Sequence, residues 1–220
     1  MTFDLLGGQF FWAALVLSYA VLVDGGFVKR KLGSVVRPAG IVAIRELLRK
    51  ISEADCLKGM RLHRVYYYDA KPLDGSEEKP LGGGLVDFGK HPTVARFQAL
   101  QSELAREPFV SLRLGELSFN GWNVAGKFLQ KSRTPKVEID ASHLVPNITQ
   151  KGVDMRIGMD IAALTLKRQV QVIVLVTGDS DFVPAMKFSR REGAQLFLVH
   201  LGHGIKESMR EHSDLIVDIL

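Results

Sequence analysis

Cysteine is almost absent from this chain of 220 residues. The single cysteine, Cys56, cannot form a disulfide within the chain, and it cannot supply the set of thiolates that a structural zinc site needs. A disulfide-stapled secreted fold and a cysteine-based zinc module are therefore excluded. Since so little cysteine is compatible with a reducing compartment, we expect a cytoplasmic protein.

The chain also lacks an apolar run long enough to cross a membrane. Residues 10–23 form the most apolar stretch, whose 14 residues fall short of the roughly 20 that a spanning helix needs. The only charged side chain before this stretch is Asp4, whereas a signal peptide carries positive charge there. We expect a buried helix or strand here, with a membrane-touching segment as the less favoured alternative.

Low hydrophobicity and high net charge, which mark a disordered chain, are both missing. Hydrophobic residues make up 46% and charged residues 24%, and Lys plus Arg exceed Asp plus Glu by 5 (29 − 24). This excess is compatible with a polyanionic partner but does not require one. Since no internal repeat is visible, we expect one domain over residues 19–220, with an apolar extension over residues 1–18 and a loop-rich insertion around residues 71–150.

Strand and helix patterns alternate along the chain, which predicts an α/β fold with a parallel sheet. Residues 71–92 are rich in Gly and Pro and predict a long mobile loop, while residues 115–150 show no clear pattern. We expect strands at residues 19–23, 63–68, 109–114, 170–177, 196–200 and 215–220, and helices at residues 38–50, 93–107, 154–167, 182–192 and 205–211.

Aspartates follow two of the expected core strands. Asp24 comes directly after residues 19–23, and Asp179 and Asp181 follow residues 170–177. Because ligands of open α/β sheets bind outside the carboxyl ends of the strands, we expect these side chains to share one crevice. Asp154, at the start of a helix after a Lys-Gly turn, is expected to join them.

Clustered carboxylates repel one another unless a cation neutralises them, and hard oxygen donors suit Mg²⁺ or Mn²⁺. The alternative is that each Asp only forms a turn or caps a helix. Asp160 lies six residues after Asp154, about 120° further around an ideal helix. We therefore expect Asp160 to contact the metal ligands rather than the metal, to be a distal ligand, or to be only a solvated or capping carboxylate.

Four short motifs occur in an order that resembles the NYN domain, in particular the LabA-like (DUF88) branch of the PIN-like ribonuclease superfamily. The resemblance runs from about residue 19 to residue 220. It implies a PIN-like three-layer fold with a central, mainly parallel sheet flanked by helices. The motifs are DGGF from Asp24, YYD ending at Asp69, KGVD ending at Asp154 with Asp160 further on, and TGDSDF from Thr177.

The resemblance also implies a metal-dependent nuclease that hydrolyses RNA phosphodiester bonds, with no organic cofactor. Asp24, Asp154, Asp179 and Asp181 match the acidic positions, and Asp160 matches a second acidic position on one helix. Bound Mg²⁺ or Mn²⁺ would lower the pKa of a water molecule and stabilise charge on the phosphate. Asp181 is our candidate for orienting that water.

One departure from the family pattern favours a different function. Many members carry Asn shortly after the first Asp, whereas Gly26 and Phe27 stand here. The alternative is therefore a weakly active or inactive regulatory module that binds RNA or a protein partner. A phosphatase of the dehalogenase type needs a D-x-D-x-T motif, and a dinucleotide site needs G-x-G-x-x-G after a strand, and neither is present.

Basic residues beside the acidic motifs are expected to contact single-stranded or structured RNA. Each such contact releases counterions and weakens with salt. His200 and His203 are interpreted as loop residues, the tyrosines at positions 66–68 as core, and a homo-oligomer is left open. We expect phosphate contacts from Lys29, Arg30, Lys31 and Lys151. For Lys187, Arg190 and Arg191, a solvated helix face is at least as good an interpretation as phosphate contact.

Overall fold

A computed structural model describes residues 16–34, 37–131 and 136–219 of the protein. Most of the expected extension, including residues 10–15 of the apolar stretch, lies outside these residues. The division into an extension and one domain stays a prediction. Among the described residues, no helix combines the length and the apolar character that crossing a bilayer requires.

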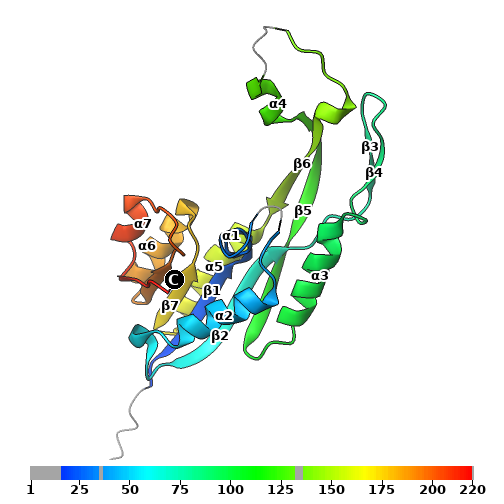
Figure 1. The fold of residues 1–220 in the computed structure, drawn as a ribbon. Helices are drawn as coiled ribbons and strands as arrows, with labels where there is room; N and C mark the ends of the chain where they lie inside the picture. The colour runs from blue at the N-terminus through cyan, green and yellow to red at the C-terminus, as the bar shows by residue number, and fades with distance from the viewer. Residues whose placement is uncertain (1–15, 35–36, 132–135, 220) are drawn as a thin grey trace, which may run out of the picture.

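A seven-stranded sheet in the order β6-β5-β2-β1-β7-β8-β9 forms the centre of the fold (Figure 1). Neighbouring strands run parallel, except that β5 and β6 are antiparallel. The predicted α/β class with a mainly parallel sheet is therefore confirmed. The strands are β1 (Ser18–Asp24), β2 (Arg61–Ala70), β3 (Ser76–Lys79), β4 (Gly84–Asp87), β5 (Val110–Val124), β6 (Leu144–Lys151), β7 (Val172–Val176), β8 (Gln195–Val199) and β9 (Leu215–Ile216).

Helices cover both faces of the sheet, because alternate side chains of its central strands point to opposite sides. Val21 of β1 packs in a core with α2 and α3, whereas Leu22 packs in a second core with α5, α6 and α7. The helices are α1 (Gly25–Lys31), α2 (Ile41–Ser52), α3 (Pro92–Leu104), α4 (Gly126–Lys131), α5 (Val153–Leu166), α6 (Val183–Arg191) and α7 (Glu207–Glu211), with 3₁₀ turns η1 (Asp55–Leu57), η2 (Ala141–His143) and η3 (Ser180–Phe182).

The expected loop over residues 71–92 is wrong in one respect, because it contains the antiparallel hairpin β3–β4. The turn between these strands uses the left-handed residues Leu81 and Gly82, with φ of 60° and 73°. The sequence SEEK of β3 has no apolar alternation, so its strand character was not visible in the pattern.

Residues 115–150, which showed no pattern, hold most of a long ribbon made of β5 and β6. Figure 1 shows this ribbon leaving the body of the sheet, with β3–β4 alongside and α4 at its far end. Trp122 of β5 donates from Nε1 to the carbonyl of Glu78 at 3.0 Å, and its ring stacks on Phe88. The hairpin and the ribbon thereby hold each other in place. The expected strand at residues 109–114 is only the first part of β5.

Candidate active site

The site lies where β1 and β7 end side by side. These strands are parallel neighbours, with Val23 opposite Val176, so the next residues of both meet at the carboxyl edge of the sheet. The Thr177 hydroxyl donates to Asp24 Oδ2 at 3.1 Å, and the Asp179 amide donates to the same hydroxyl oxygen at 3.2 Å. One hydroxyl therefore connects the first and the last acidic motif.

Asp24 has a structural role as well as a place in the site. Its Oδ1 accepts from the Phe27 amide at 3.0 Å and caps α1, as the alternative interpretation proposed. Burial raises the pKa of Asp24 and the negative charge of Asp154 raises it further, whereas the Phe27 amide, the Thr177 hydroxyl and Arg30 lower it. A carboxylate accepts up to about four hydrogen bonds or metal bonds. Capping therefore leaves Asp24 free to bind a cation.

Helix α5 brings Asp154 to the same edge of the sheet. It stands in the first turn of this helix, after Gly152, whose φ of 77° allows the chain to turn out of β6. Burial raises the pKa of Asp154, and the charges of Asp179 and Asp181 raise it further. All three residues are exposed, and Asp179 and Asp181 lie near the start of η3. The four acidic positions of the sequence motifs therefore influence one another electrostatically.

The donor types fit Mg²⁺ or Mn²⁺, but the present spacing does not form a coordination shell. Within the parts of the chain that the structure describes, no three His, Cys, Asp or Glu side chains lie close enough together to hold one ion. Binding therefore requires the exposed carboxylates to move inward, or water to bridge them to the ion.

Asp160 is bound by side chains from two strands of the sheet. Its Oδ2 accepts from the Tyr68 hydroxyl at 2.8 Å and from Arg113 Nε at 3.0 Å. These bonds connect α5 to β2 and β5, and burial together with the charge of Asp160 holds the pKa of Tyr68 well above its usual value. Asp160 is therefore an anchor of α5, and its place behind the metal ligands or as a distal ligand stays a prediction.

Lys29 is not available for RNA. It is 7% exposed, and its Nζ lies 2.8 and 2.7 Å from the two carboxylate oxygens of Asp69 and 4.0 Å from the centre of the Phe97 ring. The charge run KRK suggested an exposed patch, but its first member points into the core. Lys29 therefore leaves the set of expected phosphate contacts.

The other basic residues divide into three groups. Arg190 donates to Asp214 and Arg191 to Glu192, so both are engaged within the protein, while Lys187 and Lys151 are exposed. Arg30 and Lys31, at the end of α1, line a cavity at the carboxyl edge. These two cations are the ones that the fold brings to the acidic motifs.

That cavity has a volume of about 500 Å³. Phe27 and His203 line it although the sequence analysis assigned neither to the site. The only signal for His203 was its place after the expected strand at residues 196–200, because the carboxyl end of that strand reaches the same edge. The lining is completed by Asp24, Arg30, Lys31, Gly178, Asp179 and Ser180.

A family model described as NYN domain matches residues 18–220, nearly the whole chain. The chain belongs to the NYN domain family. This family is part of the PIN-like nuclease superfamily. The acidic residues at the carboxyl edge of the sheet are thus acidic residues of an NYN domain.

Two further proteins resemble this NYN domain. The uncharacterized protein MJ0482 of Methanocaldococcus jannaschii is 24% identical over 74 residues, which are 34% of this chain and 31% of that protein, so the match spans about a third of each. A protein of unknown function from Vibrio parahaemolyticus, VPA0982, superposes with a TM-score of 0.51 over 93% of this chain and 94% of its own, at 13% identity. The second likeness shows the fold alone.

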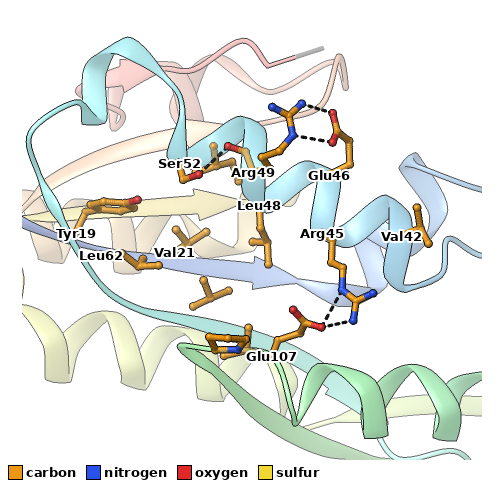
Figure 2. Close-up of a pocket in the computed structure, with 14 residues that line it drawn as sticks. Tyr19, Val21, Val42, Arg45, Glu46, Leu48, Arg49, Ser52, Leu62 and Glu107 are labelled. Atoms are coloured by element: carbon orange, nitrogen blue, oxygen red, sulfur yellow. Dashed lines mark hydrogen bonds and ion pairs between the residues drawn. The ribbon is translucent and has the colours of Figure 1, made fainter.

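A larger cavity, of about 700 Å³, lies at the opposite end of the NYN domain, near the start of β1 and β2. Figure 2 shows Val21, Leu48 and Leu62 facing this space. The charged side chains around it bind one another, as Arg45 pairs with Glu107 and Arg49 with Glu46. None of the acidic motif residues lines it.

Proposed function

We propose that this NYN domain is a metal-dependent ribonuclease of the LabA-like branch, acting in the cytoplasm on single-stranded or structured RNA. Asp24, Asp154, Asp179 and Asp181 would hold Mg²⁺ or Mn²⁺. The observation that carries the proposal is a group of carboxylates at the carboxyl edge of β1 and β7, where the Thr177 hydroxyl connects Asp24 with the Asp179 amide. Burial and the charges of Asp179 and Asp181 raise the pKa of Asp154 beside them. Among the described residues, none of the four forms an ion pair.

The side chains at the cavity would have different roles in hydrolysis. The bound ion would supply a water molecule of lowered pKa and would stabilise charge on the phosphate. The Thr177 hydroxyl orients Asp24 through its bond to Oδ2. Arg30 and Lys31 face the same cavity and would bind the phosphate oxygens of the RNA backbone. Asp181 is our candidate for orienting the attacking water.

A second function, RNA or protein binding with little turnover, is supported by two observations. Phe27 stands near the first Asp, where many relatives carry a polar Asn, and its ring forms part of the cavity wall. The carboxylates are also not grouped around one point. Under this alternative the cavity would retain its cations for binding but would hold the metal ion too weakly for catalysis.

The deciding experiment is cleavage of a labelled single-stranded RNA with Mn²⁺, with Mg²⁺ or with EDTA. We expect cleavage only with metal, and a loss of about a hundredfold or more in Asp179→Asn, because a charged ligand is removed. Asp55→Asn is the matched control, since Asp55 is exposed and pairs only with Lys58. Cleavage in EDTA, or in Asp179→Asn at the wild-type rate, would contradict the proposal. RNA binding without cleavage would favour the second function.

A further inference from the structure

The turn that follows β8 is held in an unusual conformation. Leu201 and Gly202 both have left-handed backbones, with φ of 49° and 64°, and Leu is a residue for which this is uncommon. The His203 amide donates to the His200 carbonyl at 2.8 Å, and His200 Nδ1 lies 2.8 Å from the His203 carbonyl oxygen. The Leu201 side chain is buried in the core, which offsets the backbone strain. His203 therefore projects from a fixed turn.

The imidazole of His203 packs against the floor of the cavity at the carboxyl edge. Its ring meets Phe27 edge to face, with centroids 5.7 Å apart and planes at 68°. A Cβ atom on Gly178 would come within 2.4 Å of His203 Cδ2 and 2.7 Å of Phe27 Cε2. Only glycine leaves room for this contact, directly before Asp179. One carbon edge of the imidazole is thus fixed beside the acidic motif.

His203 is exposed, so its ring nitrogens are open to solvent or to a ligand in the cavity. Across the described ranges, neither ring nitrogen of His203 has a hydrogen-bond partner in the protein. An imidazole always carries at least one N–H donor. Arg30 and Lys31 line the same cavity as Asp24 and Asp179, so the cations can bind an anionic ligand beside the carboxylates.

We propose that His203 donates a hydrogen bond to a phosphate oxygen of bound RNA and so fixes the RNA backbone beside the carboxylates. This inference rests on the proposed function, because it requires RNA in the cavity at the carboxyl edge. We assign the contact to the ring nitrogens, because the carbon edge of the ring already packs against Gly178 and the ring meets Phe27 edge to face. His203 is therefore a substrate-binding residue that the acidic motifs do not include.

Three substitutions separate hydrogen bonding from packing. His203→Phe keeps an aromatic ring against Phe27 but has no donor, His203→Gln keeps a donor, and His203→Ala removes both. Binding of a fluorescent single-stranded RNA in EDTA is measured by anisotropy, with melting temperatures to confirm folding. We expect Ala and Phe each to weaken binding on the order of tenfold, and Gln to recover part of the loss, as for a hydrogen bond to a charged group. Binding by His203→Phe at the wild-type level would overturn the inference.

Running the cleavage assay with the same variants distinguishes this inference from the nuclease proposal. If the wild type cleaves and all three variants bind and cleave like it, the inference is wrong and the nuclease stands. If the wild type binds RNA but never cleaves, while His203→Phe binds tenfold more weakly, the inference stands and the nuclease proposal is wrong. If the wild type binds no RNA, the inference is overturned as well.

Discussion

The two ends of the central sheet differ in whether their charged side chains form ion pairs. At the amino end, the cavity of about 700 Å³ has apolar walls, and its charged residues Arg45, Glu107, Arg49 and Glu46 pair with one another. At the carboxyl end, the smaller cavity of about 500 Å³ holds Asp24 and Asp179, and neither has an ion pair among the described residues. Unpaired charge, rather than volume, distinguishes the candidate active site, because it costs stability unless a ligand compensates it.

The largest expected effect tests a basic residue that belongs to neither cavity. Lys29→Met leaves Asp69 buried without its partner, and we expect a loss of about 3–5 kcal/mol in the free energy of unfolding, measured in urea. The double variant Lys29→Met with Asp69→Leu should regain most of this loss, because two apolar side chains need no partner. Lys58→Met, at an exposed pair, is the control and should change little. A small loss in Lys29→Met, with weaker RNA binding, would return Lys29 to the RNA-contacting set.

The next effect separates catalysis from stability at the carboxyl end. In Asp24→Asn the amide oxygen can still cap α1, but the charged ligand is lost. We expect cleavage to fall about a hundredfold, with a melting temperature no lower than that of the wild type. Cleavage retained in this variant would remove Asp24 from the metal ligands.

The same variant gives a pH dependence whose sign is fixed by the raised pKa of Asp24. A carboxyl that binds its proton more tightly when folded destabilises the protein as pH rises from its ordinary pKa, about 3.9, through the raised value. In EDTA, the melting temperature of Asp24→Asn minus that of the wild type should therefore increase as the pH rises through this range. If the difference in melting temperature between Asp24→Asn and the wild type shrinks with rising pH, the pKa of Asp24 is not raised.

A moderate effect is expected from the cations of the carboxyl end. Arg30→Ala and Lys31→Ala should each weaken RNA binding several-fold and reduce the salt slope of the logarithm of affinity by roughly 0.7, the value for one phosphate contact to a single strand. Lys187→Ala, on an exposed helix position, serves as the control. An unchanged slope in both variants would place the RNA elsewhere.

The smallest effect is expected at the amino end. Val42 lines the large cavity and is 76% exposed, so Val42→Lys adds a charge there without disturbing the core. RNA binding, cleavage and melting temperature should all stay at the wild-type level. A loss of RNA binding would mean that the amino end takes part in function, and the contrast between the two ends would then no longer hold.

The predictable part of the fold is the part written in local patterns. The runs that became β1 and β7 are apolar on both faces, as strands of a parallel sheet must be, and their closing aspartates are visible beside them. Strand β3 is polar, and the hairpin β3–β4 and the far part of β5 depend on contacts between distant residues, such as that of Trp122 with Glu78, which no local pattern contains.

The site was predictable to the same extent. The acidic positions could be assigned because each stands next to its strand or helix. Lys29 could not, because its partner Asp69 lies 40 residues away and only the pairing of β1 with β2 brings them together. The partners of Asp160 were not predictable for the same reason, since Tyr68 and Arg113 lie 92 and 47 residues away from it along the chain. His203 depends on a turn whose conformation a sequence pattern does not specify.

The bonds of Asp160 also constrain residues far from any motif. Six residues of helix separate Asp160 from Asp154, which is about 9 Å along the axis. The hydrogen bonds that Tyr68 and Arg113 donate to Asp160 therefore fix how far α5 extends toward the carboxyl edge. A substitution at Arg113 would shift Asp154 without touching it, so the geometry of the candidate site depends on β5 as well as on the aspartates.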